Sequence, residues 1–378
     1  MNKKILTIFP LLFLVCSCSN TSGNTTTPIV NELLDNVDVD DFDYFHHIGR
    51  YDLNNNKVIY TYSSSGFALN IKVTEEINSL SIQYSSSISG IDINKNKEQF
   101  IYIYVDDTAS KINISGTGEL IIFNNLPVGD HKIKVIKANE TFTTFEVSSL
   151  KIVGAKYSKY KNDLKRLEIY GDSTSCGYGN LCEHYNSNND NWHGFTLEEE
   201  DSEYAYGPLL GKKLNYETSV VGYSGITISM GNNPTMLDRY DTVNNKKWDM
   251  QKYIPDLVII GLGINDNTIF TTQIAASDKE NAMAKYRLDY ISLMEKINEN
   301  APEAKIIVLY DNMIEMDAAL ITMMENAVET INGNIGEDIA YIYQSTGGRH
   351  GGDGHPTKDN QQATADGLFT FINENNLI

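Results

Sequence analysis

The chain has 378 residues, enough for two or three domains that each bury their own core. Its composition, with 41% hydrophobic and 21% charged residues, is typical of a globular protein. The 50 acidic residues outnumber the 30 basic ones, the formal net charge is -20, and no basic cluster occurs along the sequence. Binding to nucleic acid depends on neutralising phosphates with Lys and Arg, so the composition argues against nucleic acid as a partner.

Residues 1–17 have the pattern of a secretory signal peptide. Lys3 and Lys4 precede a short apolar core and then small residues, and the apolar run is too short to span a membrane. The segment VCSC at residues 15–18 resembles the lipobox of bacterial lipoproteins, whose lipidated cysteine becomes the mature N-terminus. This resemblance implies lipidation at Cys18, a membrane anchor, and an extracytoplasmic or cell-surface location. The alternative is an ordinary cleaved signal peptide.

A polar tract rich in Ser, Thr, Asn and Gly predicts a flexible tether over residues 18–44. From residue 45 to 157 hydrophobic residues recur with period two, in short runs that Gly, Asn and Asp interrupt, and no helical stretch occurs. This pattern predicts an antiparallel β-sandwich or jelly-roll domain. His46 and His47 lie near its start without a partner at ligand spacing, so we expect them to be structural and predict no metal site.

The pattern changes after the basic linker KYSKYKNDLK, and residues 158–378 form a second predicted domain. Continuous apolar strands now alternate with helical patterns: the strands are RLEIYG, ETSVVGY, DLVIIGLG, AKIIVLY and IAYIY, and the helices span residues 205–214, 279–299, 317–331 and 358–374. Such alternation predicts a three-layer α/β/α domain with a mostly parallel sheet. In sheets of this kind the site lies outside the carboxyl ends of the strands.

Polar clusters stand where such a site is expected. Three of them follow strands and a fourth precedes the last helix: GDS (171–173), GYSG (222–225), GLGIND (261–266) and DGHP (353–356). Each alone would be interpreted as a turn or a helix cap. Together, at one edge of a parallel sheet, they supply the groups that acyl transfer requires.

Each group has an expected role. Ser173 is the predicted nucleophile, and His355 is the base that takes its proton. Asp353 is the nearest carboxylate that would orient His355. The predicted oxyanion hole consists of the backbone N–H groups of Ser173 and Gly225 and the side-chain amide of Asn265.

Competing interpretations remain for some residues. The turn after the third strand lacks the last glycine of a dinucleotide-binding motif, because Asp266 occupies that position and would repel a pyrophosphate. Ser224 is a rival nucleophile, one residue short of a G-x-S-x-G motif. Cys176 and Cys182 either form a disulfide in an oxidising compartment or stay reduced.

The four blocks resemble those of SGNH (GDSL-type) hydrolases, and the agreement is closest with carbohydrate esterase family two, whose members are acetylxylan esterase-like. The segments GDSTSCGYGN, EDSEYAYGPLLGKKL and DGHP carry the resemblance, which covers nearly all of the mature chain. Members of that family place a jelly roll before the catalytic domain. Gly354 stands where members often have a tryptophan, and Trp192 is a candidate replacement for that aromatic wall. Some relatives rest the histidine on a backbone carbonyl, so Asp353 and a carbonyl are alternatives.

The resemblance implies a lipid-anchored, extracytoplasmic serine esterase that removes O-acetyl groups from carbohydrate. Its expected partner is an acetylated polysaccharide or oligosaccharide, and the reaction needs no metal or organic cofactor. Two alternatives stay open: a lipase, thioesterase or peptidoglycan O-acetyl esterase with the same machinery, and a surface glycan-binding protein without catalysis.

Overall fold

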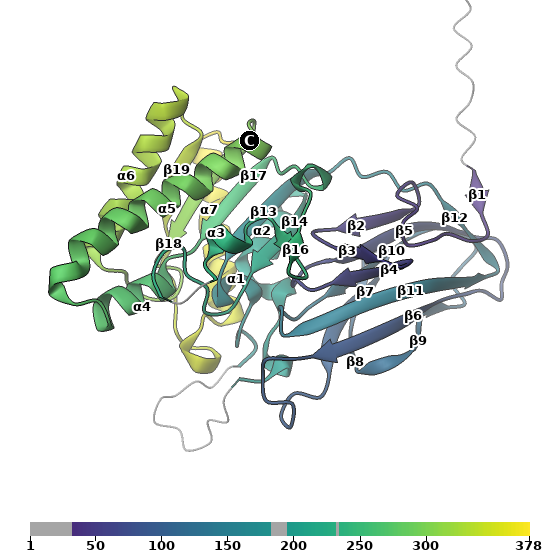
Figure 1. Cartoon of the computed structure of the whole chain (residues 1–378). Coiled ribbons are helices and arrows are strands. Elements are labelled where there is room, and N and C mark those ends of the chain that lie inside the picture. Colours follow the sequence, from purple (N-terminus) through teal and green to yellow (C-terminus); the bar gives the residue numbers. More distant parts are fainter. Residues whose placement is uncertain (1–31, 183–194, 232–233) are drawn as a thin grey trace, which may run out of the picture. The chain divides into compact units, whose positions relative to one another are not determined.

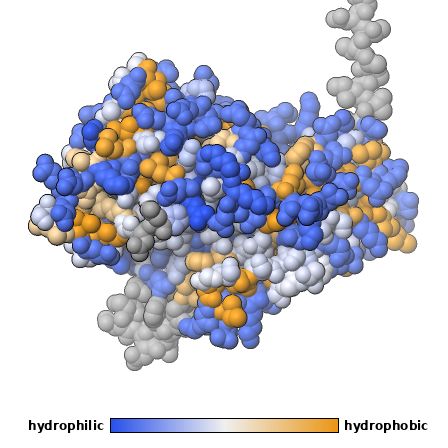
Figure 2. All heavy atoms as spheres, viewed as in Figure 1, coloured by the Kyte–Doolittle hydropathy of each residue, from blue (hydrophilic) through white to orange (hydrophobic). Residues whose placement is uncertain are grey.

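The computed structural model describes residues 32–182, 195–231 and 234–378 (Figure 1). The predicted signal peptide, the lipidation site Cys18 and Trp192 lie outside these residues. Within the described part of the chain, no helix has the length and apolarity needed to cross a membrane. Figure 2 shows a face on which hydrophilic residues predominate and hydrophobic residues form small groups, as the excess of acidic residues predicts.

The N-terminal domain consists of two antiparallel sheets. One has the order β1-β12-β5-β10-β7-β8, with β2 also paired to β5, and the other has the order β3-β4-β11-β6-β9. The strands of the first sheet are β1 (Leu33–Leu34), β2 (Phe45–Ile48), β5 (Gly66–Val73), β7 (Gln99–Val105), β8 (Thr108–Ile114), β10 (Gly129–Lys137) and β12 (Ala155–Ser158). Those of the second are β3 (Asp52–Asn54), β4 (Lys57–Tyr60), β6 (Ser79–Ile88), β9 (Gly116–Asn124) and β11 (Thr143–Val153). The predicted all-β domain is confirmed.

Alternation along the strands explains why the two sheets face each other. Phe67, Leu69 and Ile71 of β5 are fully buried, and they pack in the same core as Phe145 and Val147 of β11. Side chains at every second position therefore point to the space between the sheets.

The tether prediction is wrong for its last part. Leu33 and Leu34 form β1 and pair with Ser158 and Tyr157 of β12. Val39 is buried as well, because the segment that follows β1 packs into the sandwich core. A few hydrophobic residues among the many acidic ones thus hold this segment on the sandwich. The polar composition of residues 18–44 as a whole does not reveal them.

The C-terminal domain is built on a five-stranded sheet with the order β14-β13-β17-β18-β19, in which all pairs are parallel. Its strands are β13 (Lys165–Gly171), β14 (Tyr216–Gly222), β17 (Leu257–Gly261), β18 (Lys305–Tyr310) and β19 (Ala340–Gln344), and a small hairpin, β15 (Thr242–Val243) and β16 (Lys246–Lys247), lies in the connection before β17. The predicted parallel sheet is confirmed. Strand order reverses beside β13, which is where such sheets place their sites.

Helices cover both faces of this sheet (Figure 1). The α-helices are α1 (Ser173–Cys176), α2 (Tyr206–Leu214), α3 (Met236–Arg239), α4 (Ile264–Thr272), α5 (Lys279–Asn300), α6 (Ala318–Ile335) and α7 (Lys358–Glu374), and the 3-10 turns are η1 (Leu197–Glu199), η2 (Ser202–Tyr204), η3 (Met250–Lys252), η4 (Ala276–Asp278) and η5 (Gly352–Gly354). The four predicted helices correspond to α2, α5, α6 and α7. Helices α2 and α7 contact each other, as do α5 and α6.

Both faces of strand β17 are covered by other elements. Leu257 and Ile259 of β17 join the cluster that α7 closes with Leu368 and Ile372, whereas Ile260 packs in the cluster on the opposite face. Both sides of the strand are buried, so its sequence is a continuous apolar run.

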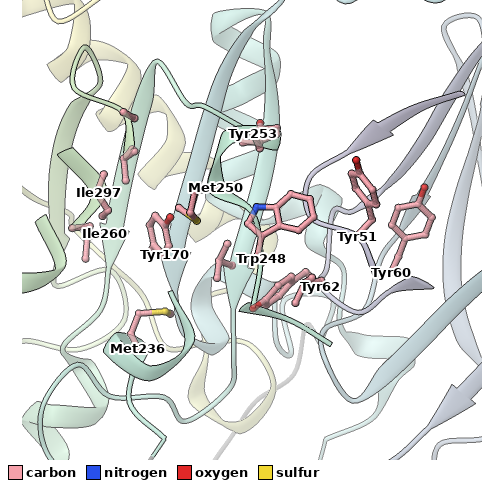
Figure 3. Close-up of a cluster of buried hydrophobic side chains, with 14 of the residues drawn as sticks. Tyr51, Tyr60, Tyr62, Tyr170, Met236, Trp248, Met250, Tyr253, Ile260 and Ile297 are labelled. Atoms are coloured by element: carbon pink, nitrogen blue, oxygen red, sulfur yellow. The ribbon is translucent and has the colours of Figure 1, made fainter. Parts of the chain in front are cut away.

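The two domains share one hydrophobic core. Tyr51 and Tyr62 of the sandwich lie in the same cluster as Tyr170 of β13, and Trp248 stands among them (Figure 3). The rings of Tyr51 and Trp248 meet edge to face, with centroids 5.1 Å apart. Aromatic pairs in this geometry stabilise a contact beyond the area that they bury, so the sandwich is part of the folded body that carries the parallel sheet.

A buried ion pair crosses the same boundary. Arg50 of the sandwich donates through Nε and Nη2 to the Glu168 carboxylate of β13, at 3.1 and 3.2 Å. Arg50 also donates to the hydroxyl of Tyr170 at 2.9 Å, and both members of the pair are almost fully buried. Removal of either charge leaves the other without compensation inside the protein.

We therefore expect Glu168→Ala to lower the free energy of unfolding by about 3–5 kcal/mol, because it strands the buried Arg50 guanidinium. Equilibrium urea denaturation measures this loss. The matched control is Glu146→Ala, which breaks an exposed 2.7 Å pair with Lys57 and should cost no more than about 1 kcal/mol. Equal losses in the two variants would contradict the account of the domain boundary.

Candidate active site

A row of glycines ends three neighbouring strands. Gly171 of β13 is in register with Gly222 of β14 and with Gly261 of β17. A Cβ on Gly171 would stand 1.8 Å from Ser175 Oγ, and one on Gly222 would stand 2.7 Å from Cys176 Sγ. The glycines therefore leave the room in which helix α1 sits directly at the carboxyl edge of the sheet.

Helix α1 begins at Ser173, and Asp172 is its N-cap. The Asp172 carboxylate accepts hydrogen bonds from the backbone N–H and the hydroxyl of Thr174, at 3.0 and 2.9 Å. Burial raises the pKa of Asp172 to about 6. Because Ser173 is the first helical residue, its own N–H has no acceptor within the helix and is available to a ligand.

The histidine loop lies against the serine helix. The distance between His355 Nε2 and Ser173 Oγ is 2.8 Å, so the predicted nucleophile and base form a hydrogen bond. Gly352 N–H donates to the Gly179 carbonyl at 2.8 Å. Gly179 has a φ of +63°, and a Cβ there would lie 2.6 Å from the Gly352 oxygen. Two glycine-rich segments thus meet backbone to backbone and bring His355 to Ser173.

The other ring nitrogen of His355 does not face the predicted carboxylate. Nδ1 lies 3.2 Å from the Gly352 carbonyl, whereas the Asp353 carboxylate accepts from the Tyr178 hydroxyl at 2.9 Å. Asp353 has a φ of +52° within the tight turn η5, and its side chain is directed to Tyr178. The structure therefore has the backbone-carbonyl arrangement, and the predicted hydrogen bond between Asp353 and His355 is corrected.

The remaining predicted donors come from the loops after β14 and β17. Ile226 N–H donates to the Tyr223 carbonyl at 3.2 Å, which closes a turn with Gly225 as its third residue. Gly225 has a φ of +77°, and a Cβ on it would meet open space. The backbone conformation at this position favours glycine. The Asn265 amide donates one hydrogen to the Ile226 carbonyl at 3.0 Å, which ties the two loops together.

Asp266 holds this loop from the inside. Its carboxylate accepts from the backbone N–H groups of Ile228, Ser229 and Met230, at 3.0, 2.9 and 2.8 Å. Burial raises its pKa to about 6. Sequence reasoning considered Asp266 only as a group that repels pyrophosphate and missed this role, although its place directly after Asn265 in a strand-end cluster was a usable signal.

These residues open onto a cleft of about 500 Å³. Besides Ser173, Gly225, Asn265 and His355, the lining includes polar side chains from α4, apolar side chains and one guanidinium: Asn267, Thr268, Thr271, Thr272, Ile264, Met313, Ile314 and Arg349. Ser224, the rival nucleophile, also lines the cleft, but its hydroxyl bonds to the Glu140 carboxylate. Ser173 is the serine that faces the histidine.

An aromatic wall is present without a tryptophan in the histidine block. The ring of Tyr178 stacks on Phe195 with centroids 3.9 Å apart, and it lies 4.4 Å from the ring of His355. Trp192, the predicted replacement, falls outside the described residues. Tyr178 belongs to the serine block GDSTSCGYGN. The sequence shows that an aromatic residue stands there, but it does not show that the ring packs against His355.

Residues 169–357, half of the chain, match the GDSL-like lipase/acylhydrolase family. The chain belongs to this family. The predicted SGNH-type domain is thereby confirmed.

Two curated relatives and a solved structure extend the comparison beyond the GDSL-like domain. Cellulase/esterase CelE of Acetivibrio thermocellus is 26% identical over 275 residues, which span 68% of this chain but only 31% of CelE. The acetylxylan esterase / glucomannan deacetylase of Cellvibrio japonicus is 24% identical over 95% of this chain and 96% of its own length. A family two carbohydrate esterase from Clostridium thermocellum, solved with cellohexaose, superposes with a TM-score of 0.73 at 23% identity and covers 88% of this chain and all of that one. The two-domain fold is the same.

The structure of this GDSL-family chain also shows the surroundings of its cysteines and of His46 and His47. No disulfide joins Cys176 and Cys182, so the disulfide alternative is not realised. Cys176 is fully buried, and burial raises the pKa of its thiol. Among the described residues, no group of three or more His, Cys, Asp and Glu side chains could hold a metal ion. His46 and His47 bond instead to protein groups, at 2.6 Å to Glu217 and 2.8 Å to the Tyr60 hydroxyl.

Burial also sets the protonation of the predicted base. It lowers the pKa of His355 to about 4, although the Gly352 carbonyl and the Asp353 carboxylate oppose the shift. The imidazole of this GDSL-family chain is consequently neutral at pH 7, which is the form able to accept a proton from Ser173.

We expect kcat/KM of this GDSL-family chain to stay high as pH falls below 6.5, the ordinary histidine value, and to be lost only near pH 4. The reason is that His355 keeps its neutral form until its own lowered pKa is reached. A pH profile of 4-nitrophenyl acetate hydrolysis measures this. A loss centred at or above pH 6.5 would contradict the assignment, whereas a partial loss near pH 6 that Asp172→Asn or Asp266→Asn abolishes would come from protonation of that buried carboxylate.

Proposed function

We propose that the chain is a serine esterase that removes O-acetyl groups from carbohydrate. The observation that carries this proposal is the 2.8 Å contact between Ser173 Oγ and His355 Nε2 at the edge of an open cleft. A serine hydroxyl becomes a useful nucleophile only when a base can remove its proton, and the neutral His355 stands ready for that task.

In the proposed reaction Ser173 Oγ attacks the acetyl carbonyl while His355 Nε2 takes its proton. The negative charge on the tetrahedral oxygen meets the N–H groups of Ser173 and Gly225 and the Asn265 amide, which are fixed before the reaction begins. His355 then protonates the departing sugar oxygen, and an acetyl-serine remains. Water repeats the path and releases acetate. The Gly352 carbonyl holds Nδ1–H, so the proton-accepting lone pair stays on Nε2.

A carbohydrate substrate is supported by the lining of the cleft and by the relatives. The α4 side of the cleft presents hydroxyl and amide groups from Asn267, Thr268, Thr271 and Thr272, which suit a ligand rich in hydroxyls. The relatives are named as a cellulase/esterase and as an acetylxylan esterase / glucomannan deacetylase. We therefore favour an acetylated polysaccharide or oligosaccharide over a lipid or a thioester.

We further propose that the enzyme acts outside the cytoplasm as a lipoprotein anchored through Cys18. The support is the signal-like pattern of residues 1–17 and the segment VCSC that follows its apolar core. A polymeric substrate agrees with this location, because polysaccharides reach an exported enzyme without crossing a membrane.

The decisive test compares the wild type with Ser173→Ala. We expect the wild type to hydrolyse 4-nitrophenyl acetate and to release acetate from acetylated xylan or glucomannan, and Ser173→Ala to lose about 10⁴-fold or more in kcat. A panel with 4-nitrophenyl palmitate and O-acetylated peptidoglycan separates the alternative substrates. Activity that survives in Ser173→Ala would contradict the assignment of Ser173 as the nucleophile. Polysaccharide binding by an inactive wild type would favour a glycan-binding protein.

A second pair of variants tests how His355 is supported. We expect His355→Ala to lower kcat by about 10⁴-fold, and Asp353→Asn by no more than about tenfold, because Nδ1 rests on the Gly352 carbonyl and an asparagine still accepts from Tyr178. Steady-state kinetics on 4-nitrophenyl acetate measures both. Losses of equal size would mean that Asp353 acts as a full third member of the site.

A further inference from the structure

The turn that carries Gly225 is held by the sandwich domain. Glu140, which follows β10, accepts from Ser224 N–H through Oε2 at 2.8 Å and from the Ser224 hydroxyl through Oε1. Tyr62 of the same domain shares a 2.6 Å hydrogen bond with the hydroxyl of Tyr223. The first two residues of the four-residue turn thus have their polar anchors in the other domain.

We infer that Glu140 is a positioning residue, which fixes the position of the turn that presents the Gly225 N–H and so completes the oxyanion hole from the β-sandwich domain. This inference rests on the proposed esterase function. It means that the sandwich is part of the catalytic machinery and is more than an attached module.

The direction of the Gly225 N–H depends on the form of the turn. A turn closed by a hydrogen bond from its fourth to its first residue exists in two common forms, which differ by about half a turn of the central peptide. In this loop the central peptide joins Ser224 to Gly225, and the positive φ of Gly225 corresponds to the second form. Rotation to the other form would turn the Gly225 N–H away. The N–H and side chain of Ser224 keep nearly the same place in both forms, so Glu140 acts on the position of the turn: it fixes the Ser224 residue from which the Gly225 peptide extends.

Glu140 is itself rigidly held. Its backbone N–H donates to Glu200 Oε2 at 3.2 Å, and its carbonyl accepts from Lys137 Nζ at 2.8 Å and from Thr143 N–H at 3.0 Å. The residue is fully buried. Because Glu140 has so little freedom to move, the position of the sandwich domain fixes the position of Ser224.

The chemistry of a carboxylate is matched to this task. Its two oxygens are both acceptors, and Ser224 presents two donors. A glutamine in the same place would keep one acceptor, would meet the Ser224 hydroxyl as a donor, and would lose the charge that strengthens both bonds. Burial of a carboxylate destabilises the folded protein unless the group accepts such hydrogen bonds. The buried position of Glu140 is therefore explained by its two bonds to Ser224.

The test is Glu140→Gln in the full chain, assayed with 4-nitrophenyl acetate. We expect kcat to fall by about 10- to 100-fold while KM stays within about twofold, because a displaced oxyanion donor affects the transition state and not the bound ester. The simple ester separates this inference from the choice of carbohydrate. A wild type without Ser173-dependent hydrolysis would overturn the proposed function and this inference together.

The matched control is Glu217→Gln. Glu217 is also a buried carboxylate between the two domains, where it accepts from His46 at 2.6 Å and from Asn162 at 2.8 Å, but it lies near the amino end of β14, at the opposite end of that strand from the Ser224 turn. Its variant should lose thermal stability and keep kcat within about twofold. A folded Glu140→Gln with unchanged kcat, or an equal loss of kcat in Glu217→Gln, would overturn the inference.

Should Glu140→Gln fail to fold, Ser224→Ala tests the same contact. This variant keeps the buried carboxylate and the backbone hydrogen bond but removes the hydroxyl donor. We expect kcat to fall at least about threefold with KM within about twofold, since one of the two restraints on the turn is lost. An unchanged kcat in this variant would overturn the role assigned to Glu140.

Discussion

The contact between Ser173 and His355 depends on the close approach of two glycine-rich segments that lie far apart in the sequence. Gly179 and Gly352 meet through a 2.8 Å backbone hydrogen bond, and neither the left-handed conformation of Gly179 nor the distance to the Gly352 oxygen leaves room for a Cβ. A side chain at this point would separate the helix that carries the serine from the loop that carries the histidine. The glycines that surround Ser173 and His355 are therefore part of the geometry and not a sign of loop flexibility.

The sandwich and the parallel sheet share one hydrophobic core and contact each other through buried polar groups. Their common core contains Tyr51 and Trp248, and the buried pair of Arg50 and Glu168 ties the sandwich to strand β13. The contact from Glu140 reaches the turn of Gly225, so the same boundary that stabilises the protein also bears on its site. A domain added only to bind a ligand would need neither the shared core nor a buried charge in the boundary.

Much of the fold and the positions of the main site residues could be predicted from the sequence because each left a local pattern. A strand such as β17 is buried on both faces and reads as an apolar run, and Ser173 and Asn265 follow such strands directly. The direction of Asp353 could not be predicted, since it depends on a left-handed turn and on Tyr178, which is distant in the sequence. Glu140 left no local signal either, because its partner stands 84 residues away in another domain.

Gly225 shows what the structure adds to a donor predicted from its place after a strand. Its φ of +77° favours glycine, and the open space beside it belongs to the cleft. The donor at this position is a backbone group, so its position also depends on the residues that hold the turn. Asn265 and Asp266 hold it on one side and Glu140 on the other. Changes at these anchors should therefore alter the rate of this chain even where Ser173 and His355 are intact.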